Sequence, residues 1–126
     1  MDEREIIRRW LNRLAHSAAT QELEKHMQLI SRQVQTILPD GRIVDYEGWR
    51  QRRHNEFSKG LLLRLIHGEP AVMSVNDREI VFHIRETLRG SRGETYTLRK
   101  EVTLARELDD EWRLVFERIN SVQSGG

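Results

Sequence analysis

The sequence predicts one α+β domain, in which helices come first and a strongly curved, mainly antiparallel sheet packs around them in the shape of a cone. Apolar residues recur every three or four positions in the first part of the chain, but alternate with polar residues through most of the second half. Short turn signals separate the alternating segments, as between neighbouring antiparallel strands. We place the domain at residues 1–122 and expect residues 123–126 to be a flexible tail.

The N-terminal part predicts two helices. From Asp2 to about Ala19, apolar residues share one face of a helix and arginines fill the other. The negative charge of Asp2 suits a helix start. A second helix is expected from Thr20 to His26, with Thr20 as its N-cap.

A hairpin and a third helix are expected next. Residues 29–38 alternate with a period of two, and Pro39-Asp40-Gly41 is a turn signal before a short strand at 43–45. Residues 46–59 are helical, and Gly60 is suited to end that helix.

The rest of the chain predicts long strands. Residues 61–75 are strand-like but interrupted at His67–Pro70, which indicates a bulge or kink. In residues 79–89 the more apolar parity includes Ile80, Phe82 and Ile84, and it is the expected inner face. Strands are also expected at 95–108 and at 112–122. In the last strand we expect Trp112, Leu114 and Phe116 on one side.

Composition narrows the function classes. The 126 residues include 21 basic and 20 acidic side chains, so the net charge is +1 and gives no general attraction to nucleic acid. Cysteine is absent, which excludes disulfides and thiolate chemistry. No export signal or membrane-spanning run is visible, so we expect a cytoplasmic protein without membrane contact. No histidine pair has metal-ligand spacing, and no cofactor motif is present; we expect neither metal nor cofactor.

The most characteristic stretch runs from Asp45-Tyr46-Glu47-Gly48-Trp49 to Phe57. With the order helix, helix, hairpin, helix and long strands, it resembles the nuclear transport factor 2-like superfamily, which includes SnoaL-like, ketosteroid-isomerase-like and other cystatin-like folds. The resemblance implies a cone with a pocket for a small, often apolar ligand, and a homodimer formed through the outer sheet face. On that face we expect Val81, Val115 and Ile119 among charged residues, a mixed surface typical of a pairing face. Members of the superfamily include enzymes and non-catalytic binding domains, so the fold leaves the function open.

Ketosteroid isomerases of this superfamily use a carboxylate near the first hairpin and a hydrogen-bonding pair deep in the cone. This chain offers Thr36-Ile37-Leu38 and Glu101-Val102-Thr103 in the corresponding stretches, and Trp10 with Asn12 in the first helix. That departs from the isomerase pattern, so no catalytic residue is assigned.

Among the histidines, three are pocket candidates because imidazole transfers protons near neutral pH. His26 is expected at the pocket mouth, or alternatively as a helix C-terminal residue. His54 is more simply a residue at the edge of the core. His83 is more simply on the outer face with Arg85.

Aromatic side chains complete the candidate set, although most aromatic residues are core residues. The candidates are Trp10, Tyr46, Trp49, Phe82 and Tyr96. Tyr46 is the best hydroxyl donor among them, with packing at the start of a helix as its simpler interpretation. The basic run Arg50–His54 is interpreted as a solvated helix face.

Three functions follow. The first is a homodimeric domain that binds a small molecule in a cone-shaped pocket. The second is an isomerase, cyclase or dehydratase that uses His or Tyr for proton transfer. The third is a subunit or interaction module resembling the small subunits of dioxygenases. A buried histidine with a carboxylate or tyrosine partner inside the cone would favour the enzyme. A dry apolar cone without ionisable groups would favour the binding domain. A filled cone with a large exposed apolar sheet face would favour the module.

Overall fold

The computed structural model describes residues 2–125 and confirms the α+β class, with helices preceding most of the sheet. Within this range the helices are α1 (Glu3–Ala19), α2 (Leu23–Met27) and α3 (Tyr46–Ser58). The strands are β1 (Ile30–Ile37), β2 (Ile43–Val44), β3 (Arg64–His67), β4 (Ala71–Val75), β5 (Glu79–Arg89), β6 (Thr95–Arg106) and β7 (Trp112–Gly125).

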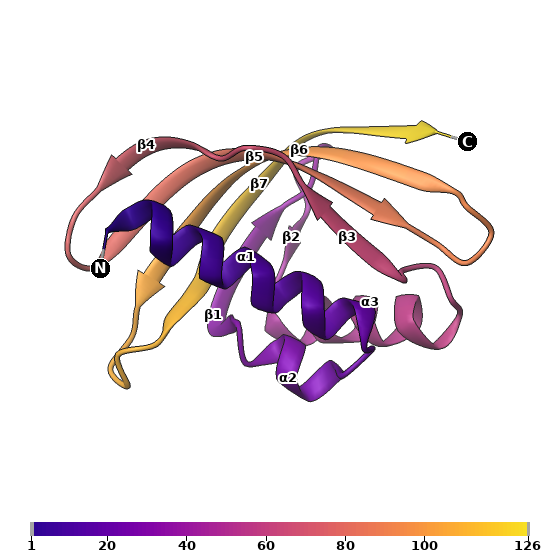
Figure 1. Ribbon diagram of the computed structural model, residues 1–126, viewed down its shortest axis with the longest axis horizontal. Helices are drawn as coiled ribbons and strands as arrows, with labels where there is room; N and C mark the ends of the chain where they lie inside the picture. Colours follow the sequence, from indigo (N-terminus) through magenta and orange to yellow (C-terminus); the bar gives the residue numbers. More distant parts are fainter. Residues whose placement is uncertain (1, 126) are drawn as a thin grey trace.

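The strands form one mixed, open sheet in the order β2-β1-β7-β6-β5-β3, and β4 pairs with β5 on the same side as β3. The first hairpin, β1 with β2, is antiparallel as expected, but β1 lies parallel to β7. The sheet curls over the three helices, with α1 crossing beneath the long strands and α3 lying under the other end (Figure 1). The concave face of the sheet is therefore covered unevenly along its strands.

Helix starts follow ordinary capping chemistry. The Asp2 side chain accepts a hydrogen bond from the backbone N–H of Glu5, and the Asp45 side chain accepts one from the N–H of Gly48. Gly60, with φ +67°, follows α3 in the left-handed region that glycine tolerates. The second helix is shorter than expected and begins at Leu23.

The interruption expected at residues 67–70 separates β3 from β4, and both strands pair with β5. Strand β7 continues to Gly125 and stays paired with β6. Residues 123–125, expected in the tail, are therefore part of the sheet, and Gly126 lies outside the described residues.

The side assignment expected for the last strand is wrong beyond Leu114. The register between β6 and β7 shifts after Leu114, so that Leu104 faces Leu114 while Val102 faces Glu117. This bulge moves Phe116 to the outer face and Glu117 to the inner one. Ile119, expected on the outer face, is paired with Lys100 and buried.

The apolar core lies between α1 and the middle of the sheet. Its fully buried side chains include Ile7, Leu14, Ile80, Phe82, Leu104 and Leu114. No helix among residues 2–125 has the length and apolar character needed to cross a membrane.

Candidate functional site

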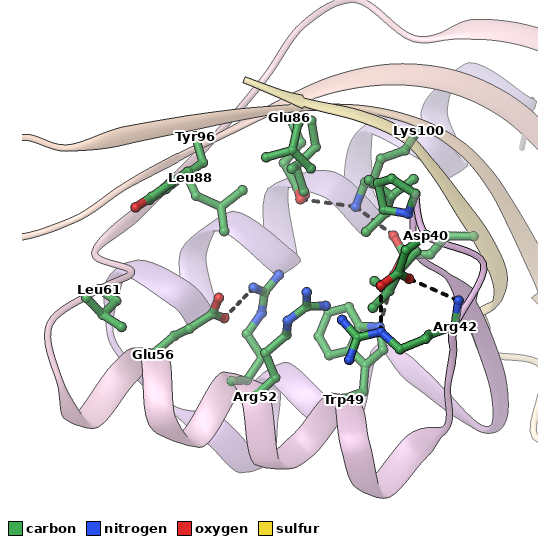
Figure 2. A pocket seen from close by; sticks show the side chains of 17 residues that line it. Asp40, Arg42, Trp49, Arg52, Glu56, Leu61, Glu86, Leu88, Tyr96 and Lys100 are labelled. Carbon is green, nitrogen blue, oxygen red and sulfur yellow. Dashed lines mark hydrogen bonds and ion pairs between the residues drawn. The ribbon is translucent and has the colours of Figure 1, made fainter. Parts of the chain in front are cut away.

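A cavity of about 520 Å³ opens between α3, the β1–β2 hairpin and the inner face of β5, β6 and β7 (Figure 2). Its volume is within the usual range for small-molecule sites. The apolar part of the wall includes Leu38, Trp49, Leu61, Leu88, Tyr96, Leu98, Ile119 and Val122. The charged part consists of Asp40, Arg42, Arg52, Arg53, Glu56, Glu86, Lys100 and Glu117.

Three buried charges form the inner wall of this cavity. The Nζ atom of Lys100 lies 3.0 Å from Glu86 Oε1 and 2.8 Å from Glu117 Oε1. The three side chains come from β5, β6 and β7, and each is almost completely buried. We call Glu86, Lys100 and Glu117 the charge cluster. Two carboxylates around one ammonium give it a net negative charge.

Glu117 is held by two hydrogen-bond donors from other elements. Its Oε2 atom accepts a hydrogen bond from Thr36 Oγ1 at 2.9 Å and another from Trp49 Nε1 at 3.0 Å. Its Oε1 atom is buried without a hydrogen-bond partner in the described part of the chain, although Lys100 is close enough for an ion pair. Glu117 is therefore fixed in orientation, with one oxygen held by two donors and the other facing the ammonium of Lys100.

Glu86 connects the charge cluster to His67 on β3, the strand that pairs with β5 at the edge of the sheet. Its Oε2 atom lies 2.8 Å from His67 Nε2, and its Oε1 atom accepts from Lys100. Both carboxylate oxygens of Glu86 are therefore hydrogen-bonded.

The surroundings of Glu86 and Lys100 keep these two side chains charged. Burial alone would raise the pKa of Glu86, but Lys100 and His67 outweigh this and hold the pKa well below its usual range. For Lys100, burial would lower the pKa, but Glu117 and Glu86 together raise it. At neutral pH Glu86 is therefore a carboxylate and Lys100 an ammonium.

His26 on α2 is a second buried polar group, and it contacts the cavity wall through Arg53 of α3. His26 is fully buried; its Nε2 atom accepts a hydrogen bond from Arg53 Nε at 3.0 Å, and its Nδ1 atom lies 2.9 Å from Ser17 Oγ. Since Arg53 only donates, His26 must be the neutral tautomer with the proton on Nδ1. Burial, together with the charge of Arg53, lowers the pKa of His26 to about 3. His26 is thus a fixed neutral acceptor for Arg53.

Arg53 joins this histidine to the cavity wall. Its guanidinium lies 4.6 Å from the centre of the Trp49 ring, and its Nη1 atom donates to Glu56 at 2.8 Å. Closer to the mouth, Arg42 pairs with Asp40 at 2.7 Å. The wall near α3 and the hairpin therefore contains two arginine–carboxylate pairs.

Of the residues predicted for the pocket, Trp49 and Tyr96 line the cavity. His26 lies one residue behind it, through Arg53. Trp10 and Phe82 lie in the packed core under α1, where Trp10 donates to the carbonyl of Leu29.

The other three predicted residues lie elsewhere. Tyr46 is half-buried with the Arg32 guanidinium 4.7 Å from its ring centre. His54 is exposed on α3, and His83 is exposed on the outer sheet face near Glu101. None of these three residues lines the cavity.

Sequence reasoning missed the whole charge cluster, although two of its members follow a visible pattern. Glu86 shares the parity of Ile80, Phe82 and Ile84, and Lys100 shares that of Val102. A charged residue on the apolar side of a strand is the signal that would have found them. Glu117 carried no such signal, because the bulge in β7 decides which side it faces.

No group of three or more metal-ligating side chains of the His, Cys, Asp or Glu type is present within residues 2–125. The lysine between the two carboxylates occupies the place that a cation would take.

The chain matches no known family model and no curated protein sequence. It is similar in structure to a nuclear transport factor 2-like protein from Cytophaga hutchinsonii, with 16% identity, a TM-score of 0.75, and coverage of 96% of this chain and 99% of the other. A protein of unknown function with a cystatin-like fold from Nostoc punctiforme has 14% identity, a TM-score of 0.72, and coverage of 93% and 88%.

A candidate aromatic ring hydroxylase from Novosphingobium aromaticivorans also shares the fold, with 14% identity, a TM-score of 0.72, and coverage of 98% and 93%. At these identities the similarity shows the fold alone. The chain therefore has the nuclear transport factor 2-like, cystatin-like fold that its element order predicted.

Proposed function

We propose that this chain, a domain of nuclear transport factor 2-like fold, binds a small, mainly apolar molecule in the cone, with the inner end of that molecule against the charge cluster. The observation that carries the proposal is the cavity of about 520 Å³, which combines apolar walls with buried, fixed charges. Small-molecule sites typically have this composition: an apolar surface and a few oriented polar groups.

Blocking the cavity tests the proposal. Leu98 points into it from β6, so Leu98→Trp should fill it, whereas Thr97→Trp places the same bulk on the opposite face of that strand. Binding of small aromatic probes can be followed by the NMR signal of the Trp49 indole N–H, which donates to Glu117. We expect probe-induced shifts in the wild type and in Thr97→Trp, and their loss in Leu98→Trp. Equal binding by both variants would contradict the proposal.

A proton-transfer enzyme is the second candidate, and the geometry of Glu117 favours it. One oxygen of this carboxylate is fixed by Thr36 and Trp49, and the other has no hydrogen bond in the described chain but is ion-paired with Lys100 at 2.8 Å. A general base needs such an oriented carboxylate, and Lys100 would stabilise a negative charge that forms nearby. The proton-transfer residue would then be Glu117, instead of the His or Tyr expected from the sequence.

Exchange of substrate protons with solvent separates this enzyme from a binding domain. A panel of ketones and enols should exchange C–H hydrogen for deuterium in the presence of the wild type and not with Glu117→Gln, if Glu117 is a base. Binding of the same compounds without exchange would favour the binding domain. The interaction module has less support, because the cone contains a cavity.

We also propose a homodimer formed through the outer sheet face, where Val81 and Val115 are half-buried among charged side chains. Arg85 lies opposite Arg99 on this face, so two copies would bring like charges together. Because salt screens this repulsion, the dimer should strengthen as ionic strength rises. Sedimentation at low and high salt measures this, and a monomer at micromolar concentration in both would contradict it.

A further inference from the structure

The charges around the cavity are paired unevenly. Arg42 is paired with Asp40 and Arg53 with Glu56, at 2.7 and 2.8 Å. Arg52 also lines the cavity, but it makes no ion pair or hydrogen bond in the part of the chain described, 2–125. Arg52 is therefore a cation of the cavity wall without a counterion.

The helix places Arg52 there by its periodicity. Trp49, Arg52, Arg53 and Glu56 lie three or four residues apart and so share the face of α3 that borders the cavity. Figure 2 shows Arg52 rising from α3 between Trp49 and Glu56 toward the open space. Arg50, on another face of the same helix, is instead paired with Glu24.

Arg53 adds further donor capacity beside Arg52. Its hydrogen bonds use Nε, toward His26, and Nη1, toward Glu56. The Nη2 group has no hydrogen bond with another described residue, and a guanidinium has five N–H donors in total. The α3 side of the cavity thus offers unused donors from two neighbouring arginines.

The inner wall has the opposite character. Glu86 and Glu117 outnumber Lys100, so the charge cluster carries an excess negative charge. A further carboxylate at this end would meet repulsion from both glutamates. The cavity is therefore polarised, with excess positive charge at Arg52 and excess negative charge at the cluster.

We propose that the ligand is a small apolar carboxylic acid, whose carboxylate pairs with Arg52 while its apolar body lies along Leu88 and Leu98. The proposal rests on the proposed binding function and names its ligand class. The planar guanidinium matches a carboxylate with two parallel hydrogen bonds, and the apolar wall between the two ends accommodates the body.

Matched acids and alcohols provide the test. Benzoic, 2-naphthoic and octanoic acids, and the alcohol corresponding to each, are titrated against the protein with the Trp49 indole N–H signal as readout. We expect at least one acid to bind about tenfold more tightly than its alcohol, the size of effect that a charged hydrogen bond gives. In Arg52→Gln that preference should disappear.

Two further variants make the outcome decisive. Arg50→Gln removes an arginine from the same helix outside the cavity, and the preference for the acid should survive. Arg52→Lys keeps the charge but loses the paired hydrogen bonds, and an intermediate preference is expected. All three substitutions lie at side chains with substantial exposure, so folding is not at risk.

Equal affinities for acid and alcohol in the wild type would overturn the ligand class but leave the binding function standing, since the alcohols still occupy the cavity. An acid preference that persists in Arg52→Gln would overturn the assignment of Arg52. If neither acids nor alcohols move the Trp49 signal up to their solubility limits, both the ligand class and the proposed function fail.

Discussion

The two ends of the cone are built from the same strands and the same inner face, but their contents differ. Under α1, strands β5 and β6 contribute Ile80, Phe82 and Leu104, which are fully buried apolar side chains. Under α3, the same strands contribute Glu86 and Lys100, which border a cavity. In β5 and β6 the strand alternation continues unbroken across the change, so the difference there is one of residue type. In β7 a bulge also contributes, because it turns Glu117 to the inner face.

This contrast separates folding from function within one sheet. The α1 end follows the usual rule that a covered sheet face is apolar. The α3 end departs from this rule, because its covered face contains charged side chains. The cost of burying them is offset, since each has an opposite charge or a hydrogen-bond partner close by. Such compensated exceptions are expected at functional sites.

Removing the lysine should have the largest effect on stability. Lys100→Met leaves Glu86 and Glu117 buried without their shared cation, and breaking a buried ion pair in this way costs about 3–5 kcal/mol. Denaturant unfolding measures the loss. Lys25→Met, at an exposed lysine on α2, is the matched control and should change stability by less than about 0.5 kcal/mol.

Neutralising the whole cluster should recover much of that loss. Glu86→Gln, Lys100→Met and Glu117→Gln together keep acceptors for His67, Thr36 and Trp49 while removing the unbalanced charge. A triple variant as unstable as Lys100→Met alone would show that volume, and not charge, governs this end of the cone.

The apolar end should respond to a substitution of comparable size in a different way. Leu104→Ala removes a fully buried side chain under α1 and should cost about 3 kcal/mol through lost burial and a residual void. Because Leu104 does not line the cavity, probe binding measured below the unfolding transition should stay close to that of the wild type. Loss of probe binding in this variant would show that packing at the α1 end also determines the shape of the cavity at the α3 end.

The fold was predictable because its signals are local and repeated. The period of three to four in α1, the alternation in β5 and the turn at Pro39-Asp40-Gly41 each depend on neighbouring residues only. The parallel pairing of β1 with β7 was not expected, because the two strands are about eighty residues apart in the sequence and no short turn connects them.

The candidate site was predictable only in part. Trp49 and Tyr96 were predicted as pocket residues because they are aromatic, and both line the cavity. Trp10 and Phe82 were predicted for the same reason but are buried in the core, so aromatic character alone does not distinguish the two places. Glu117 was hidden by the bulge in β7. Which charges are buried depends on partners from separate strands, and no single segment contains that information.

Acid should destabilise the α3 end through His26. Burial lowers the pKa of this histidine from 6.5 to about 3. Between these two pH values His26 is protonated in the unfolded chain but neutral in the folded chain. Its contribution is complete above pH 6.5 and falls by about 1.4 kcal/mol per pH unit below it. Below about pH 4.5, protonation of Glu86 in the unfolded chain adds to the loss.

His26→Gln checks this assignment between pH 6.5 and 4.5. The variant keeps an acceptor for Arg53 but cannot titrate, so its free energy of unfolding should depend less steeply on pH than that of the wild type. The exposed His54 on α3, changed to Gln, is the matched control for the substitution. Identical slopes in all three proteins would mean that His26 is solvated and that this end of the cone is less tightly packed than described.

The smallest expected effect concerns the hydrogen bonds that orient Glu117. Thr36→Val keeps the shape of the side chain but removes the hydroxyl that donates to Glu117 at 2.9 Å, which should cost about 1.5 kcal/mol. Thr97→Val on the outer face, where the hydroxyl meets that of Thr87, should cost less than about 0.5 kcal/mol. The Trp49 indole N–H donates to Thr36 Oγ1 at 3.1 Å as well as to Glu117, so its signal will shift whenever the hydroxyl is removed. The informative readout is therefore the carboxyl ¹³C signal of Glu117 itself. A shift of this signal with little loss of stability would show that hydrogen-bond donors orient the carboxylate. An unmoved signal would show that Trp49 and Lys100 fix Glu117 without help from Thr36.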